Sequence, residues 1–154
     1  MRGRVLSPGE LEGYVREQIP LSVAIGVRVL QAGPERVRIE APLAPNLNHR
    51  ATAFGGSVAT LAILTGWALV HARLVAEGRP ARTGIAESSV RYDAPIEAAF
   101  SAICEAPSPD AWARFTRTLE RRGRARLRVS VRVECRGREA ARMEGAYVAI
   151  TPRS

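Results

Sequence analysis

The sequence predicts an α+β fold in which one antiparallel β-sheet wraps around a single long, buried α-helix. Residues 51–70 contain no charged side chain, and apolar or small residues cover every face at helical period. A helix of this composition must be surrounded by protein or lipid. Segments on either side instead alternate apolar and polar residues, which is typical of half-buried strands that need a helix to cover one face.

We expect the central helix over about 54–77, from Phe54-Gly55-Gly56-Ser57 to the break at Glu77-Gly78-Arg79-Pro80. Adjacent glycines let other atoms approach the backbone closely, and the free N–H groups of a first helical turn form a small positive site. The same glycines would also serve helix–sheet packing alone. The uncharged run is about long enough to cross a bilayer, but its threonines, serine and glycines dilute the hydrophobicity. We therefore expect no membrane association.

The remaining elements are assigned from caps, breaks and alternation, within a single domain of residues 1–154. Ser7 as N-cap, Pro8 and Glu10 predict a helix over about 8–18. A second proline-bearing start predicts a short surface helix over 109–122. Alternation predicts six strands, two before the central helix and four after it, at about 23–29, 37–41, 83–92, 98–106, 126–135 and 139–150.

Composition argues against several classes of function. The net charge of +8 comes from arginine alone, because the chain has no lysine. Aromatic residues make up only 5% and do not interleave with the basic ones, so we expect no nucleic-acid binding. The arginines would rather attract a phosphorylated cofactor or an acidic carrier protein. Cys104 and Cys135 lack metal-ligand spacing, which predicts buried thiols, no metal and, without a signal peptide, a cytoplasmic protein.

The element order, Asn48 and the Phe54-Gly55-Gly56-Ser57 helix start resemble the hotdog-fold thioesterases. Within them the chain most resembles the putative thioesterase domain found C-terminal to an acetyltransferase in some bacterial proteins. The resemblance covers roughly Pro20 to Pro152 and is most specific in NLNHRATAFGGS followed by LAILTGW. It implies an antiparallel sheet around a central helix, and a homodimer, or a tetramer built from dimers, with paired sheet edges. It also implies acyl-CoA or acyl-carrier-protein thioesters bound at the dimer interface, with no cofactor.

The resemblance carries over to some residues and fails at others. In the phenylacetyl-CoA type of hotdog thioesterase, an asparagine precedes the first helix glycine by seven positions, as Asn48 does here. The N–H of the second glycine, Gly56 here, polarises the thioester carbonyl in that type. A histidine normally precedes the glycine pair, but this chain has Phe54, and a carboxylate seven positions after the second glycine is replaced by Ile63. The usual base or nucleophile is therefore missing.

Thioester hydrolysis needs a polarised carbonyl and an activated water. We expect the helix start to bind substrate through Phe54, Gly55, Gly56 and Ser57. The catalytic candidates are Asn48 to orient water, His49 as a base near neutral pH and Thr65 to hold the water. Each has an ordinary alternative, since asparagine favours turns, a loop histidine faces solvent and a helical threonine bonds its own helix.

Two carboxylates on or after the strand that follows the central helix, Glu87 and Asp93, are further candidates that would enter the site from a partner subunit. The ordinary alternative is that both are charged residues on the protein surface. The runner-up function is a non-catalytic acyl-thioester-binding module, which the isoleucine at position 63 favours. A hydratase is a weaker alternative, because hotdog hydratases use a histidine and an acid and the central helix offers no acid. Burial of Asn48 against a partner's helix start would favour the enzyme over the binding module.

Overall fold

The computed structural model describes residues 3–153, and helix α3, Gly55–Ala76, runs through its centre. The helix begins after Phe54, whose φ of −62° and ψ of 133° are extended. It ends at Glu77, before Gly78 at a φ of 66°, a left-handed conformation that glycine adopts without a Cβ clash. The expected range was about 54–77.

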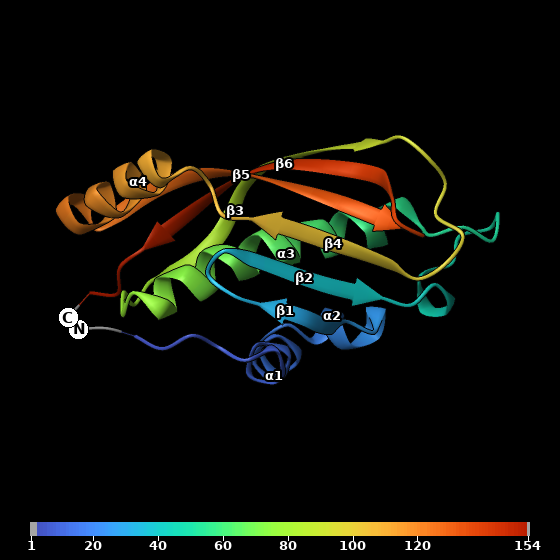
Figure 1. The fold of residues 1–154 in the computed structure, drawn as a ribbon, viewed down its shortest axis with the longest axis horizontal. Coiled ribbons are helices and arrows are strands. Elements are labelled where there is room, and N and C mark those ends of the chain that lie inside the picture. The colour runs from blue at the N-terminus through green and yellow to red at the C-terminus, as the bar shows by residue number, and fades with distance from the viewer. Residues whose placement is uncertain (1–2, 154) are drawn as a thin grey trace.

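Six strands form one antiparallel sheet that curls around α3 (Figure 1). Their spatial order is β1-β2-β4-β5-β6-β3. This architecture confirms the predicted fold class. The strands are β1 Arg28–Ala32, β2 Arg36–Ala41, β3 Arg82–Tyr92, β4 Phe100–Glu105, β5 Arg124–Cys135 and β6 Arg138–Ile150.

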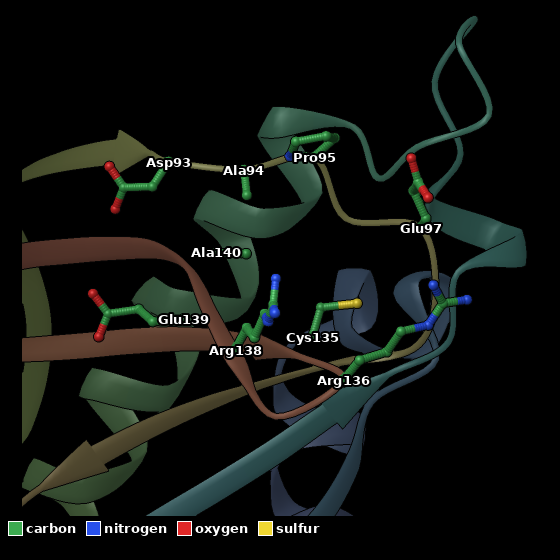
Figure 2. A pocket seen from close by; sticks show the side chains of 9 residues that line it. All are labelled: Asp93, Ala94, Pro95, Glu97, Cys135, Arg136, Arg138, Glu139 and Ala140. Atoms are coloured by element: carbon green, nitrogen blue, oxygen red, sulfur yellow. The ribbon is translucent and has the colours of Figure 1, made fainter.

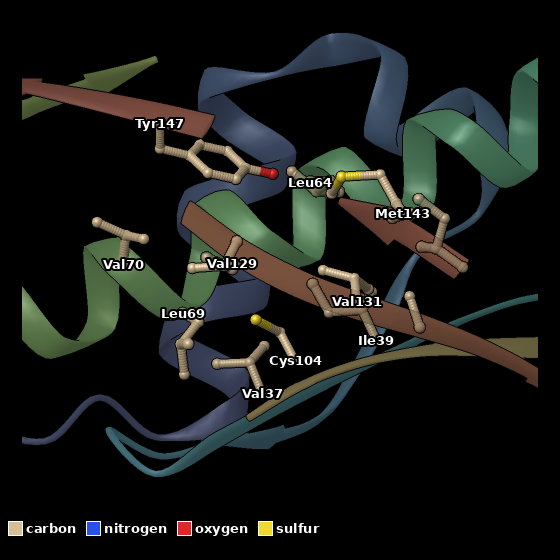
Figure 3. Close-up of a cluster of buried hydrophobic side chains, with 14 of the residues drawn as sticks. Val37, Ile39, Leu64, Leu69, Val70, Cys104, Val129, Val131, Met143 and Tyr147 are labelled. Atoms are coloured by element: carbon tan, nitrogen blue, oxygen red, sulfur yellow. The ribbon is translucent and has the colours of Figure 1, made fainter. Parts of the chain in front are cut away.

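The alternation read from the sequence assigns the two faces of the sheet. Along β5, Leu127, Val129 and Val131 are buried on the inner face of the sheet, whereas Arg126 and Arg128 are exposed on the outer face. Figure 3 shows the core between helix and sheet, where side chains of α3 meet those of β2, β4, β5 and β6. An apolar face toward the helix and an arginine face toward water let a single sheet stay folded without a second cover.

The N-terminal segment contains two helices instead of one. Helix α1, Pro8–Gln18, has the expected capping box between Ser7 and Glu10. Residues 20–25, however, form helix α2, Pro20–Ile25, so the predicted strand over 23–29 is wrong in its first half. Pro20 suits a first helical position, and Ser22 donates a hydrogen bond to the Ile19 carbonyl at 2.6 Å. Gly26 then ends the helix at a φ of 78°.

Helix α4, Pro109–Arg122, packs along β5 and reaches the C-terminal end of α3 through a few side chains. Its Trp112 indole N–H donates to the Glu77 carboxylate at 2.5 Å. The Arg73 guanidinium stacks over the same indole ring at 4.5 Å. These contacts tie the C-terminal end of the long helix to α4, whereas its N-terminal end lies away from α4 (Figure 1).

Helix α3 is the one helix within residues 3–153 that is long and apolar enough to cross a membrane. Core helices of globular proteins have the same length and composition, and more than half of the most apolar window of α3 is buried inside the protein.

Candidate active site at the start of helix α3

The first turn of α3 presents backbone N–H groups that no side chain caps. Phe54 occupies the N-cap position and supplies no side-chain acceptor. Ser57 N–H bonds back to the Phe54 carbonyl at 2.9 Å, whereas Gly55 N–H and Gly56 N–H have no acceptor among residues 3–153. The helix dipole adds positive potential at this end. The turn is therefore suited to bind an anionic oxygen or a polarised carbonyl.

Gly56 lies directly against the ring of Phe54. A Cβ at position 56 would overlap the ring edge, with Phe54 Cδ2 only 3.0 Å away. The Phe54 side chain itself is 57% exposed. A bare backbone at this position therefore keeps the N–H groups accessible beside an exposed apolar ring.

A hollow of about 320 Å³ adjoins the same helical turn. Tyr92, at the end of β3, forms one side and donates its hydroxyl to the Gly55 carbonyl at 2.8 Å. Among the described residues, Asp93 is the one carboxylate that lines the hollow, and it pairs with the Arg91 guanidinium at 2.9 Å. The remaining lining comes from Ala53, Gly55, Val58, Ala94, Pro95 and Ile96.

Asn48 organises the loop that leads into α3. Its amide nitrogen donates to the Thr52 hydroxyl at 2.8 Å and to the Ala53 carbonyl at 3.4 Å. Its amide oxygen accepts the N–H groups of Arg50 at 2.8 Å and Thr52 at 3.1 Å. A side-chain amide has two donor hydrogens and two acceptor lone pairs, so Asn48 has no capacity left for a water molecule in this arrangement. It positions the helix start from a half-buried place.

A second asparagine, Asn46, anchors the same loop. Its amide nitrogen donates to the carbonyls of Ile25 at 3.0 Å and Pro42 at 2.7 Å. Its own carbonyl accepts the Phe54 N–H at 2.7 Å. Asn46 is almost completely buried, so it fixes both the entry to the loop and the residue that precedes the glycine pair.

The other predicted catalytic residues are not brought together at the helix start. His49 is exposed in a turn. Thr65 is fully buried and donates its hydroxyl to the Leu61 carbonyl at 2.7 Å. At a rise of about 1.5 Å per residue, Thr65 also lies roughly 14 Å along the helix from Gly56. Glu87 pairs with Arg126 on the outer face of the sheet at 2.7 Å.

One stripe of α3 is not covered by the rest of the chain. The residues along it, at helical spacing, are only partly buried or exposed, namely Gly56, Thr60, Ile63 and Trp67. Beside the stripe runs the edge strand β3, which is paired on one side with β6 and has no buried residue. Ile85 of β3, 40% exposed, is the register partner of Tyr147, whose hydroxyl donates to the Ile63 carbonyl at 2.6 Å.

The family described as putative thioesterase (yiiD_Cterm) matches residues 9–151. The chain belongs to this family.

Solved structures agree with the membership. A protein of unknown function from Chlorobaculum tepidum is 26% identical, with a TM-score of 0.88 over 96% of this chain and 98% of the other. A protein from Shewanella oneidensis described as a putative thioesterase is 27% identical, with a TM-score of 0.80 over 93% of this chain and 96% of the other. A probable thioesterase from Pseudomonas aeruginosa, 21% identical, shares the fold at a TM-score of 0.80 over 97% and 100%. The protein is thus a hotdog-fold member of the putative thioesterase family.

Three residues of this region escaped sequence reasoning. Asn46 reads as an ordinary loop residue beside Asn48, and only its burial reveals the difference. Tyr92 and Tyr147 lie far along the chain from the Gly55 and Ile63 carbonyls that they bind. Strand alternation places both tyrosines in strands, but no local signal indicates a hydroxyl that reaches α3.

Proposed function

We propose that the protein hydrolyses acyl thioesters of CoA or of an acyl carrier protein. The observation that carries the proposal is the pair of free N–H groups at Gly55 and Gly56, beside a hollow at the start of a buried helix. Attack of water on the thioester carbon places negative charge on the carbonyl oxygen, which Gly56 N–H would stabilise. The carbon–sulfur bond then breaks, releasing a carboxylic acid and a thiol. This scheme uses no metal or redox cofactor.

Asp93 is the group that we propose to remove a proton from the attacking water. Its carboxylate is the one acidic side chain of the hollow, and positioned carboxylates serve as general bases. Asn48 acts in this proposal as a positioning residue, because its four hydrogen bonds hold the loop before the glycine pair. Asp93→Asn is expected to lower kcat, whereas the matched Glu87→Gln, on the outer face of the sheet, is expected to leave it unchanged.

We further propose that the active unit is a homodimer in which the substrate lies between subunits. The uncovered stripe of α3 and the free edge of β3 are adjacent, and exposed apolar surface next to an unpaired strand edge favours association. A second copy paired along β3 would cover Ile63 and Ile85. The acyl chain would then lie against apolar side chains of both subunits.

The alternative function is a binding module for acyl thioesters that does not catalyse hydrolysis. Two observations favour it over the enzyme. Ile63 occupies the position where the family resemblance puts a carboxylate, and the Asn48 amide is saturated within its own loop. Such a module would use the same N–H groups to hold the carbonyl.

One assay distinguishes the two functions. Purified protein is incubated with acyl-CoAs of increasing chain length and with an aryl-CoA, and free thiol is followed by a chromogenic disulfide. The thioesterase proposal expects turnover with at least one chain length, and loss of turnover in Asp93→Asn. Absence of turnover, together with a melting temperature that rises with acyl-CoA, would establish the binding module. Neither turnover nor a shift with any thioester would contradict both.

A further inference from the structure

A second and larger hollow lies at the end of the sheet, on the other side of the segment that borders the helix start. Its volume is about 500 Å³, within the range of small-molecule sites. It shares Asp93, Ala94 and Pro95 with the hollow beside Gly55. Figure 2 shows this segment on one side of the hollow and the hairpin between β5 and β6 on the other. The N–H groups of Asp93 and Ala94 bond the Ala140 carbonyl at 2.8 and 3.1 Å, which fixes the shared wall to β6.

Two arginines, Arg136 and Arg138, line the hollow. Of its acidic side chains, Asp93 pairs with Arg91 at 2.9 Å and Glu139 with Arg142 at 2.6 Å. Arg136 and Arg138 have no ion-pair partner within residues 3–153. In Figure 2 Arg138 rises from β6 toward the segment at Ala94 and Pro95. Among the acids that line the hollow, Glu97 is the one without an ion pair within residues 3–153, so the free charge of the hollow is positive.

Arg136 is held in an unfavourable backbone conformation. The hairpin turn places Arg136 at a φ of 52° and Gly137 at a φ of 77°, the pattern of a two-residue hairpin in which asparagine or glycine is preferred at the first position. A long side chain in the left-handed region costs roughly 1 kcal/mol. An arginine at a position where asparagine would stabilise the turn points to a use for its guanidinium outside folding.

We propose that this hollow binds the phosphorylated nucleotide end of CoA through Arg136 and Arg138. The inference rests on the proposed function and specifies its substrate class, since a thioester at Gly56 would carry its CoA arm across the segment at Ala94. Guanidinium groups bind phosphate with paired, charge-assisted hydrogen bonds. The volume exceeds what a single phosphate needs and accommodates a nucleoside, which favours CoA over the single phosphodiester of a carrier-protein arm.

The test measures binding without any thioester. Adenosine 3′,5′-bisphosphate is titrated into the full-length protein by calorimetry, alongside CoA and 4′-phosphopantetheine. Arg138→Gln and Arg136→Asn are each expected to weaken the nucleotide about tenfold or more, whereas the matched control Arg117→Gln, an exposed arginine on α4, leaves affinity unchanged. Arg136→Asn is also expected to raise the melting temperature, so its loss of affinity is separable from misfolding.

A second readout uses the wild-type chain. Cys135 lines the hollow and is partly exposed, whereas Cys104 is buried, with a pKa that burial raises to about 12. Alkylation by iodoacetamide therefore reports on Cys135, and adenosine 3′,5′-bisphosphate is expected to slow it.

The proposal would be overturned if the protein did not bind the nucleotide, or if Arg117→Gln weakened nucleotide binding as much as the two other variants. It would also be overturned if 4′-phosphopantetheine bound as tightly as CoA, which would indicate a carrier-protein arm. Nucleotide binding without hydrolysis would contradict the proposed thioesterase activity alone. Hydrolysis with a KM for acyl-CoA that is unchanged in Arg136→Asn and Arg138→Gln would contradict this site alone.

Discussion

Gly66, on the sheet-facing side of α3, makes room for the Tyr147 side chain. A Cβ at position 66 would overlap the Tyr147 hydroxyl and lie 2.9 Å from its ring carbon Cζ. That hydroxyl bonds the Ile63 carbonyl, and burial raises the pKa of the Tyr147 phenol, so the group stays a protonated donor. Glycine has a low helix propensity and weakens a helix, but at position 66 it is required because the Tyr147 ring packs against the helix there.

Gly66→Ala is expected to destabilise the protein by about 1–3 kcal/mol, because the added methyl group displaces a buried ring. Helix propensity alone would give the opposite sign, a gain of about 1 kcal/mol. Urea denaturation measures the difference. The matched control is Gly13→Ala in α1, where a Cβ would meet no atom within 4 Å and stability should rise slightly. A Gly66→Ala protein as stable as wild type would contradict this packing account.

Residue-level prediction succeeded where the cause was local. The alternatives stated for Asn48 and Thr65, a loop cap and a bond to its own helix, are the contacts that the structure contains. Contacts between a helix carbonyl and a tyrosine on a distant strand depend on sheet register and curvature. Those follow from the assembled fold and not from any short window of sequence.

At the scale of elements, an aromatic stack joins α1 to α3. The His71 ring lies parallel to Tyr14 at 4.9 Å and to Trp67 at 4.8 Å between ring centroids. Trp67 also donates its indole N–H to the Thr83 carbonyl of β3 at 2.9 Å. Burial lowers the pKa of His71 below its usual 6.5, since the low-dielectric surroundings disfavour the charged ring.

Stability is expected to fall as the pH drops below about 6.5. The unfolded chain binds a proton at His71 at higher pH than the folded chain does, so acidification favours unfolding. Carboxylates with lowered pKa, such as Glu105 beside Arg36 and Arg132, lose their contribution only near and below pH 4.5. Thermal melting between pH 7.5 and 5.5 should therefore show a loss of stability. His71→Phe, which keeps an aromatic ring in the stack, should reduce that loss. An identical pH profile in the variant would assign the loss to other groups.

Most elements could be predicted from caps and alternation, and the exception is informative. Val23, Ile25 and Val27 alternate as a strand would, but Ser22 and Ile25 are buried at helical spacing in α2. The first half of this segment is too short for its hydrophobic periodicity to distinguish a helix from a strand. Its helical state follows from Pro20 at the start and Gly26 in the left-handed region at the end.

At the scale of the whole molecule, the fold leaves one edge and one helix stripe without a cover. The sheet order ends at β3, a strand of eleven residues that has no buried position. Long unprotected edges are uncommon in monomers because they pair with other chains. The arrangement of six strands around an apolar helix was predictable from the sequence and its family resemblance, whereas the strand order and the exposed edge required the structure.

Ile85→Arg is expected to convert the proposed dimer into a monomer and to abolish activity with it. A buried arginine at the subunit contact would have no partner, and unpaired buried charges are strongly destabilising. Light scattering coupled to size exclusion measures the mass. Leu21→Arg serves as the matched control, because Leu21 is also an exposed apolar residue but lies on α2. A wild-type protein that is monomeric at all concentrations would contradict the dimer proposal.

The most direct test of the central proposal is the kcat/KM of Gly56→Ala on the best acyl-CoA substrate, with Gly13→Ala as the control for a glycine-to-alanine change. A methyl group at position 56 meets the exposed ring of Phe54, which can move outward, so the melting temperature should change little. Alanine keeps the backbone N–H of residue 56, but its methyl group fills the open space beside that N–H and is expected to hold the thioester carbonyl away from it. We therefore expect kcat/KM to fall about 100-fold or more, comparable to the loss of an oxyanion donor, with Gly13→Ala unaffected. Wild-type kcat/KM in Gly56→Ala would contradict the proposal that this helix start polarises the thioester carbonyl.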